Sequence, residues 1–173
     1  MFQTKRQVYY FSLDLKKAFD TLDHDVLLQK TEKYGFRGNP LNWLHSYLTN
    51  RIQRVETNGV SSNWQTIKYG VPQGSILGPL LFLIYINDLP LACKSLEVLL
   101  FADDINLTAL NCSVENIEQD LNNVNEWLKA NRLALNMKKT VRLNIGNSAS
   151  NKDFCLSECI ILTKPVCKIL IFL

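Results

Sequence analysis

The chain has 173 residues, of which 47% are hydrophobic and 20% are charged, a composition typical of one globular domain with a hydrophobic core. Its 19 basic and 16 acidic residues leave a formal net charge of +3, which supports nucleic-acid binding only weakly. The five cysteines are odd in number and contain no CxxC pair, so we expect reduced thiols and no zinc site.

A strand is the first predicted element. Val8–Asp14 is rich in aromatic and β-branched residues and ends on an aspartate. The residues before it are polar and show neither a signal peptide nor another targeting signal, so we expect an intracellular protein.

Two helices are predicted next. The first covers Leu22–Tyr34, with Asp23 as its N-cap and Gly35 ending it. The second is expected to have Asn39 as its N-cap and Pro40 in its first turn. Its predicted apolar face consists of Leu41, Trp43, Leu44, Tyr47 and Leu48.

A hairpin and an apolar helix follow. The pair Asn58-Gly59, between Arg51–Thr57 and Asn63–Tyr69, is a strong hairpin signal. The loop Gly70–Gly74 then leads into a helix from Ile76 to about Asp88, which is too short to span a bilayer and is expected to be buried.

Two adjacent acids, Asp103 and Asp104, follow the apolar run Val98–Leu100, which we interpret as a buried strand with the acids at a hairpin tip. Because aspartate favours turns, a plain turn is the simplest interpretation. If this hairpin lies beside the strand ending at Asp14, then Asp14 and Asp103 converge. Carboxylates that repel one another at strand ends call for a hard divalent cation, as in phosphoryl-transfer sites.

The next helix is expected to be capped by Ser113. Its apolar stripe consists of Val114, Ile117, Leu121, Val124 and Leu128. Strand-like pieces within Arg132–Ile145 surround Lys138-Lys139-Thr140, and a lysine pair is normally a solvated surface feature. The pattern weakens after Gly146, so we expect one domain over 1–146 and a degenerate or truncated segment over 147–173.

Four segments, taken together and in order, are a far more specific sequence signal than any one of them alone. They are Asp14–Asp20 (DLKKAFD), Gly70–Leu80 (GVPQGSILGPL), Phe101–Asp104 (FADD) and Leu135–Thr140 (LNMKKT). In this order they resemble the palm motifs of a reverse transcriptase, an RNA-directed DNA polymerase, and most closely those of non-LTR (LINE-type, jockey-like) retrotransposons.

The resemblance implies an α+β polymerase palm, in which helices back an antiparallel sheet that carries the catalytic aspartates. It implies transfer of dNTPs to the 3′-hydroxyl of a DNA primer on an RNA template, with no membrane partner. Only 13 residues precede Asp14, so we expect most of the fingers and the thumb of the parent polyprotein to be missing here. The parent element is expected to act in the nucleus and cytoplasm.

The resemblance also implies a metal site. Asp14, Asp103 and Asp104 would be catalytic and metal-binding residues, with Asp104 the more peripheral. They would hold two Mg²⁺ ions roughly 4 Å apart, for which Mn²⁺ is a possible substitute.

Four further residues would bind the nucleotide. Phe19 would lie beneath the sugar of the incoming nucleotide and exclude a 2′-hydroxyl, although plain core packing also explains this ring. Gln73 and Gly74 would line the nucleotide and the template base. Lys139 would lie near the phosphates as an acid for the leaving pyrophosphate.

Two other interpretations stay open. The chain could be a non-catalytic relic or an interaction module, because catalysis by positioning fails when substrates are not held. A metal nuclease that uses the same three acids is disfavoured, because it assigns no role to Gln73-Gly74 or Phe19.

Overall fold

The computed structural model describes residues 7–145, 153–156 and 159–163. The chain divides into two compact units. The first unit contains the chain up to Lys16 and resumes at Asp88, and the second consists of Lys17–Asn87. Within the described ranges, no helix combines the length and the apolar character needed to cross a membrane.

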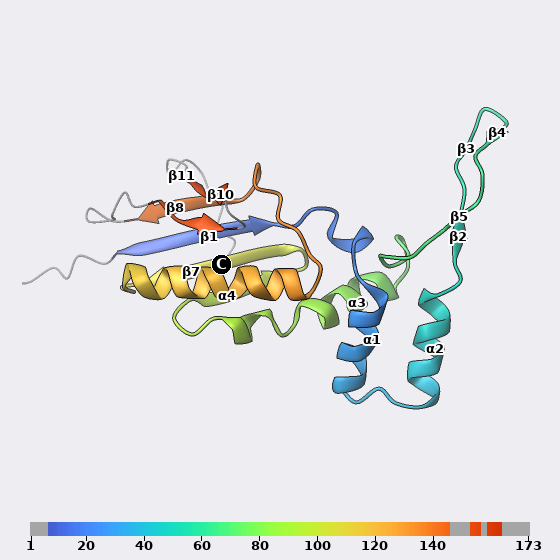
Figure 1. The fold of residues 1–173 in the computed structure, drawn as a ribbon, viewed down its shortest axis with the longest axis horizontal. Coiled ribbons are helices and arrows are strands. Elements are labelled where there is room, and N and C mark those ends of the chain that lie inside the picture. Colours follow the sequence, from blue (N-terminus) through green and yellow to red (C-terminus); the bar gives the residue numbers. More distant parts are fainter. Residues whose placement is uncertain (1–6, 146–152, 157–158, 164–173) are drawn as a thin grey trace, which may run out of the picture. The chain divides into compact units, whose positions relative to one another are not determined.

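The first unit contains a five-stranded sheet in the order β11-β8-β1-β7-β6 (Figure 1). The strands are β1 (Val8–Asp14), β6 (Glu97–Phe101), β7 (Asp104–Leu110), β8 (Val141–Ile145) and β11 (Leu162–Thr163). The central strand β1 pairs antiparallel with β7 and β8, β6 pairs antiparallel with β7, and β11 runs parallel to β8. The predicted antiparallel sheet that carries the aspartates is therefore confirmed, although β11 adds a parallel pairing that was not predicted.

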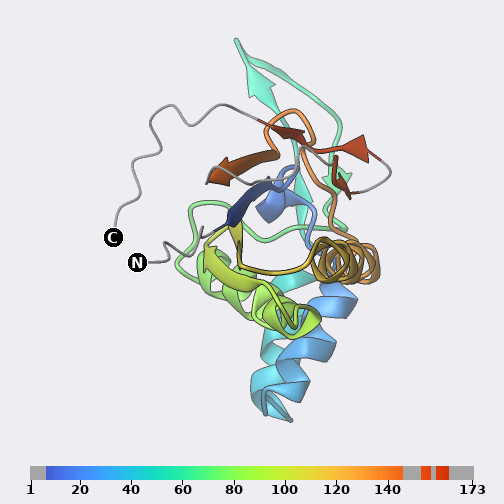
Figure 2. The same cartoon turned by 90° about the vertical axis from the view of Figure 1, so that its left-hand side faces the viewer.

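The two central strands bury alternate residues, as expected for a sheet with one face in the core. The buried side chains are Tyr9, Phe11 and Leu13 of β1 and Ile105, Leu107 and Ala109 of β7. The helix α4 (Val114–Ala130) lies alongside the sheet (Figures 1 and 2). Ser113 caps it by accepting a hydrogen bond from the Asn116 amide at 3.2 Å, as predicted, and the stripe from Ile117 to Leu128 is buried.

The apolar run Val98–Leu100 is not a buried strand. It lies in β6, at the edge of the sheet, where a strand has a neighbour on one side. Leu99 and Phe101 are 68% and 77% exposed, whereas Val98 and Leu100 are half-buried. An apolar run cannot reveal whether a strand is central or at an edge, because that depends on the pairing of distant segments.

The described part of 147–173 belongs to the first unit. Phe154 is fully buried, with its ring edge-on to Tyr9 and Phe11 at centroid distances of 5.4 and 5.5 Å. The short strands β9 (Cys155–Leu156) and β10 (Cys159–Ile160) follow it. The predicted boundary at 146 stays a prediction, and much of the predicted degenerate segment lies outside the described residues.

Three helices, a 3-10 turn and a long hairpin form the second unit. The helices are α1 (His24–Lys33), α2 (Asn39–Leu48) and α3 (Leu77–Ile86), and the 3-10 turn η1 is Ala18–Asp20. The short strands β2 (Ile52–Gln53), β3 (Glu56–Thr57), β4 (Val60–Ser61) and β5 (Gln65–Thr66) form the hairpin. Asn58 and Gly59, both with positive φ, turn the chain at its tip, so the predicted hairpin is confirmed.

The two N-caps predicted in this unit have different outcomes. Asp23 caps α1 by accepting a hydrogen bond from the Val26 amide at 3.0 Å, as predicted. The N-cap of α2 is Gly38 rather than Asn39. Gly38 has a φ of 61°, which a glycine adopts without the steric penalty of a Cβ, so the chain turns one residue earlier.

The prediction that α3 is buried is wrong for part of its surface, and the predicted apolar face of α2 is also exposed in part. In α3, Leu81, Phe82 and Tyr85 are buried, but Leu80 and Leu83 are 51% and 47% exposed. In α2, Leu44 and Leu48 are buried, but Trp43 of the predicted apolar face is 58% exposed. A continuously apolar helix carries no periodic signal that would show which side meets the core.

The strand-like piece before the lysine pair was also wrongly assigned. Residues 131–140 form turns and loop, with a single antiparallel bridge between Leu15 and Leu135. Only Val141–Ile145 forms a strand there.

Candidate active site

Asp14 and Asp104 are direct register partners on neighbouring strands. Asp14 is the last residue of β1 and Asp104 the first of β7. Residues directly opposite in an antiparallel pair place their side chains on the same face of the sheet. The predicted adjacency of the two strands is confirmed, and the residue opposite Asp14 is Asp104 rather than Asp103.

Asp103 lies in the turn that joins the two strands of the hairpin. Phe101 of β6 pairs with Asp104 of β7, so Ala102 and Asp103 form a two-residue turn. Ala102 has a φ of 51°, in the left-handed region that residues with a Cβ seldom occupy. The turn that carries the acids is therefore strained, a feature common at functional sites.

Lys139 lies beside Asp14. Its Nζ is 3.6 Å from Asp14 Oδ1, and the lysine and aspartate side chains are 69% and 26% exposed. Two hydrogen bonds attach the loop that carries Lys139 to the end of β1. The Asn136 amide donates to the Asp14 carbonyl at 2.7 Å, and the Asp14 amide donates to Thr140 Oγ1 at 3.4 Å. Thr140 is 1% exposed, and its role was missed because only the folded chain brings it to Asp14.

Tyr10 and Asn106 share the aspartate face. The Tyr10 hydroxyl donates to Asn106 Oδ1 at 2.5 Å. Burial and the negative charge of Asp104 raise the pKa of the Tyr10 phenol, against a smaller lowering by a hydrogen bond with Ser12. The hydroxyl therefore stays a neutral donor beside the acids. Neither Tyr10 nor Asn106 was singled out from the sequence. For Tyr10 a signal was present, because the period of two along β1 places it on the same face as Asp14.

The acids have the chemistry of a site for a hard cation. Asp14 and Asp104 offer carboxylate oxygens from one face of the sheet, and carboxylate oxygens are the ligands that Mg²⁺ prefers. Within the part of the chain that the structure describes, no three or more His, Cys, Asp or Glu side chains are gathered as a ready-made metal site. A pair of carboxylates still fits Mg²⁺, which keeps several waters and takes substrate phosphates as ligands.

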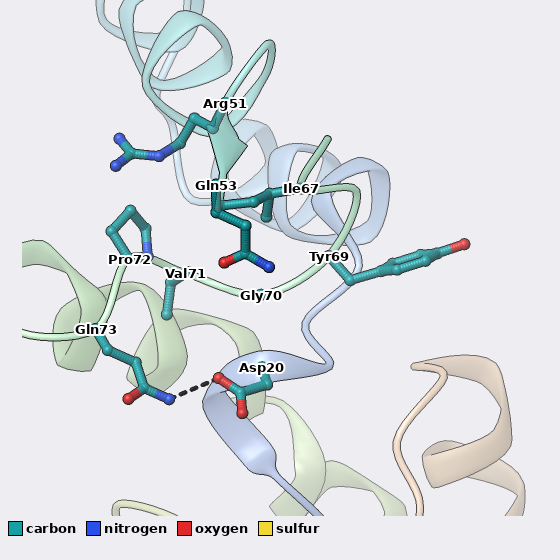
Figure 3. A pocket seen from close by; sticks show the side chains of 9 residues that line it. All are labelled: Asp20, Arg51, Gln53, Ile67, Tyr69, Gly70, Val71, Pro72 and Gln73. Atoms are coloured by element: carbon teal, nitrogen blue, oxygen red, sulfur yellow. Dashed lines mark hydrogen bonds between the residues drawn. The ribbon is translucent and has the colours of Figure 1, made fainter. Parts of the chain in front are cut away.

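The second unit contains the predicted nucleotide residues Phe19, Gln73 and Gly74. The ring of Phe19, in η1, lies 4.8 Å from that of Phe82 in α3, measured between centroids. Gln73 Nε2 donates to Asp20 Oδ1 at 2.6 Å, and Figure 3 shows the two side chains pointing toward each other. Gly74 has a φ of +75°, and a Cβ added there would meet nothing within 4 Å.

Gly70 anchors the loop before Gln73. A Cβ there would lie 2.8 Å from the Asp20 Cα and from the carbonyl oxygens of Asp20 and Phe19, and its φ is +82°. Its amide donates to the Leu22 carbonyl at 2.7 Å, and its own carbonyl lies 2.7 Å from His24 Nε2. The positive φ and the lack of room for a Cβ therefore both require a glycine at position 70.

A cavity of about 540 Å³ borders this loop (Figure 3). Its lining residues are Asp20, Arg51, Gln53, Ile67, Tyr69, Gly70, Val71, Pro72 and Gln73. Of these lining side chains, only that of Gln73 was predicted from the sequence to bind a ligand.

A sheet of mainly antiparallel strands, backed by a helix and with paired carboxylates at the end of its central strands, is consistent with a polymerase palm. Residues 1–168 match the family described as reverse transcriptase (RNA-dependent DNA polymerase), and the chain belongs to this family. The predicted resemblance is confirmed, and reverse transcriptases generally use divalent metal ions.

The relatives include proteins of non-LTR retrotransposons. The chain is 34% identical over 142 residues to a probable RNA-directed DNA polymerase from transposon BS of Drosophila melanogaster, and this match covers 75% of the chain and 15% of that protein. It is 27% identical to the RNA-directed DNA polymerase from mobile element jockey of the same species, over 78% of the chain and 16% of the relative. The chain thus spans about a sixth of the length of these relatives.

Solved structures show the same fold. Telomerase from Candida tropicalis, in complex with a fragment of telomeric RNA, matches 96% of this chain and 32% of its own, with a TM-score of 0.67. The identity is 17%, so this likeness concerns the fold alone.

Proposed function

We propose that this chain is the palm of an RNA-directed DNA polymerase that adds dNTPs to the 3′-hydroxyl of a DNA primer on an RNA template. The register pairing of Asp14 with Asp104, beside Lys139, is the observation that carries this proposal. Membership of the reverse transcriptase family supports it.

Asp14, Asp103 and Asp104 would hold the divalent ions, two Mg²⁺ by likeness to the family, with Mn²⁺ as a substitute. Such ions, when bound, supply positive charge to the primer hydroxyl and to the triphosphate. The strained turn at Ala102 would hold Asp103 close to the end of β1, where Asp14 lies. Tyr10 and Asn106 would keep the face next to the acids hydrogen-bonded and in one arrangement.

Lys139 would act on the leaving group. In the transfer, the primer 3′-hydroxyl releases its proton to solvent and its oxygen bonds to the α-phosphorus, while the bond from that phosphorus to the oxygen bridging to the β-phosphate breaks. Lys139 would give a proton to the departing pyrophosphate. Its exposed ammonium and its 3.6 Å approach to Asp14 support this role, because both groups lie at the same end of β1.

Phe19, Gln73 and Gly74 would contact the nucleotide and the template base. Packing of Phe19 against Phe82 holds the ring in place, as exclusion of a 2′-hydroxyl requires. The hydrogen bond from Gln73 to Asp20 leaves the Gln73 carbonyl oxygen as an acceptor. The expected location in the nucleus and cytoplasm stays a prediction.

Primer extension tests the proposal. The open reading frame of the element that contains this chain is expressed, and dNTP incorporation on an RNA template is measured with Mg²⁺. We expect Asp104→Asn to abolish synthesis, whereas Asp25→Asn, an exposed acid in the first turn of α1, leaves it intact. Synthesis by Asp104→Asn at the wild-type rate would overturn the proposal.

Metal binding is measured separately on this chain. Electron paramagnetic resonance of Mn²⁺ reports bound ion without any need for activity. We expect weaker Mn²⁺ binding in Asp14→Asn and Asp104→Asn than in Asp25→Asn, because each of the first two removes one carboxylate of the pair.

A further inference from the structure

One segment of the second unit has a net positive charge as large as that of the whole protein. Residues 37–69 contain four basic residues, Arg37, Arg51, Arg54 and Lys68, and one acidic residue, Glu56. This excess of three equals the formal net charge of the whole chain, so the remaining residues balance to zero. All five of these side chains are exposed.

Two aromatic rings of α2 form a row with Arg51, which follows the helix in the chain. Trp43 and Tyr47, one helical turn apart, stack with centroids 5.5 Å apart and ring planes inclined by 14°. The Arg51 guanidinium lies over the Tyr47 ring at 5.7 Å, which extends the row to the start of β2. Trp43 is 58% exposed although it is a large apolar side chain.

A second pair repeats this arrangement on the hairpin. The Arg54 guanidinium lies 4.8 Å from the centroid of Trp64, which is 57% exposed. The hairpin follows α2 directly in the chain (Figure 1). All residues of the strands β2, β3, β4 and β5 are exposed. Guanidinium groups within about 6 Å of a ring face are held by cation–π attraction, so these side chains are partly preorganised.

We propose that α2 and the β2–β5 hairpin form a binding surface for single-stranded nucleic acid, which under the proposed function, on which this inference rests, is the RNA template strand. Bases stack on exposed aromatic rings and on guanidinium planes, and arginine also pairs with phosphate. A surface with an excess of positive charge and separate aromatic–arginine stacks suits a polyanion better than an apolar protein partner, which favours one contiguous apolar patch.

The Glu56 carboxylate competes with a phosphate group for Arg54. Its Oε2 accepts a hydrogen bond from Arg54 Nη2 at 3.0 Å and another from Ser61 Oγ at 3.2 Å. A phosphate that pairs with Arg54 must displace or share this carboxylate. Removal of the Glu56 charge should therefore strengthen binding, an effect that damage to the fold cannot produce.

The test is fluorescence anisotropy of a labelled oligouridine strand titrated with the full 173-residue chain. We expect Trp43→Leu and Trp64→Leu each to weaken binding about tenfold, since one base–aromatic stack is worth roughly that factor. The matched control is Phe36→Leu, which changes another exposed aromatic residue outside the segment and should leave the affinity unchanged. Arg54→Gln should lower the slope of log affinity against log salt by about 0.7.

Glu56→Gln should bind the oligouridine more tightly than the wild type. The proposal is overturned if the chain shows no saturable binding, or if the tryptophan variants and Phe36→Leu bind equally well. It is also overturned if sedimentation shows a wild-type dimer that the tryptophan variants convert to monomer while RNA affinity stays constant, because the surface is then a protein interface. Asp104→Asn should bind oligouridine normally, so a failure of this inference is distinguishable from a failure of the catalytic proposal.

Discussion

Gln73 donates its side-chain amide to the carboxylate of Asp20 at 2.6 Å, across 53 positions of the sequence (Figure 3). Asp20 closes the first of the four motifs and Gln73 lies within the second. One hydrogen bond thus joins two segments that the sequence presents as separate, and it fixes the orientation of a proposed nucleotide-binding side chain.

Asp20→Ala should raise the KM for dNTP about fivefold and change kcat less. Loss of one hydrogen bond to a charged acceptor at an exposed position is worth about 1 kcal/mol, and Gln73 would then sample other rotamers. Steady-state primer extension by the protein that contains this chain measures both constants. Asp25→Ala is the control, and an unchanged KM for Asp20→Ala would show that Asp20 does not position Gln73.

Phe19→Ala should increase the incorporation of ribonucleotides relative to deoxyribonucleotides. The ring, which is proposed to lie beneath the sugar, would no longer exclude a 2′-hydroxyl. Single-nucleotide assays with matched dNTP and NTP measure the ratio. Phe82→Leu is the comparison, because it weakens the packing under the ring but keeps the ring itself. Unchanged sugar selectivity in Phe19→Ala would leave core packing as the role of this residue.

Gly70→Ala should destabilise the fold by about 3 kcal/mol or more, since its Cβ would clash with backbone atoms 2.8 Å away and its φ is positive. Urea unfolding of the chain measures the change. Gly74→Ala is a matched control with nearly the same φ but open space, so it should cost only about 1 kcal/mol. Equal effects of the two substitutions would mean that the close approach of Gly70 to Asp20 is absent in solution.

Asp120 should be the most important acid for the stability of the first unit. It is 2% exposed and accepts hydrogen bonds from the amides of Lys94, Ser95 and Leu96 at 2.6 to 3.1 Å. Asp120→Ala should cost about 3 kcal/mol because one buried and two partly buried backbone amides lose their acceptor. Glu126→Ala, on the same helix, removes only an exposed pair with Lys129 and should cost less than about 0.5 kcal/mol.

Stability should fall in alkaline solution because of Cys93. Burial, together with the charge of Asp120, raises the pKa of this thiol from 9.0 to about 12. Between these values the unfolded chain releases the proton and the folded chain retains it, so the stabilisation present below pH 9 is lost as the pH rises toward 12. Urea midpoints across this range measure the effect, and Cys93→Ala should reduce the slope. A slope identical to that of the wild type would contradict the burial of a protonated thiol.

Local chemistry determined much of this protein from the sequence alone. The caps Asp23 and Ser113, the turn at Asn58-Gly59 and the stripe along α4 depend on residues within one or two turns of each other, so their patterns were sufficient. The motif order likewise predicted the family, because motif residues and their spacing are properties of the chain.

Tertiary structure decided which residues meet. The pairing of Asp14 with Asp104, rather than Asp103, is set by strand register across 90 positions, and no local pattern encodes that offset. The edge position of β6 and the bond between Asp20 and Gln73 have the same origin. Contacts between distant segments depend on how the whole chain satisfies burial and hydrogen bonding together, and so only the folded protein reveals them.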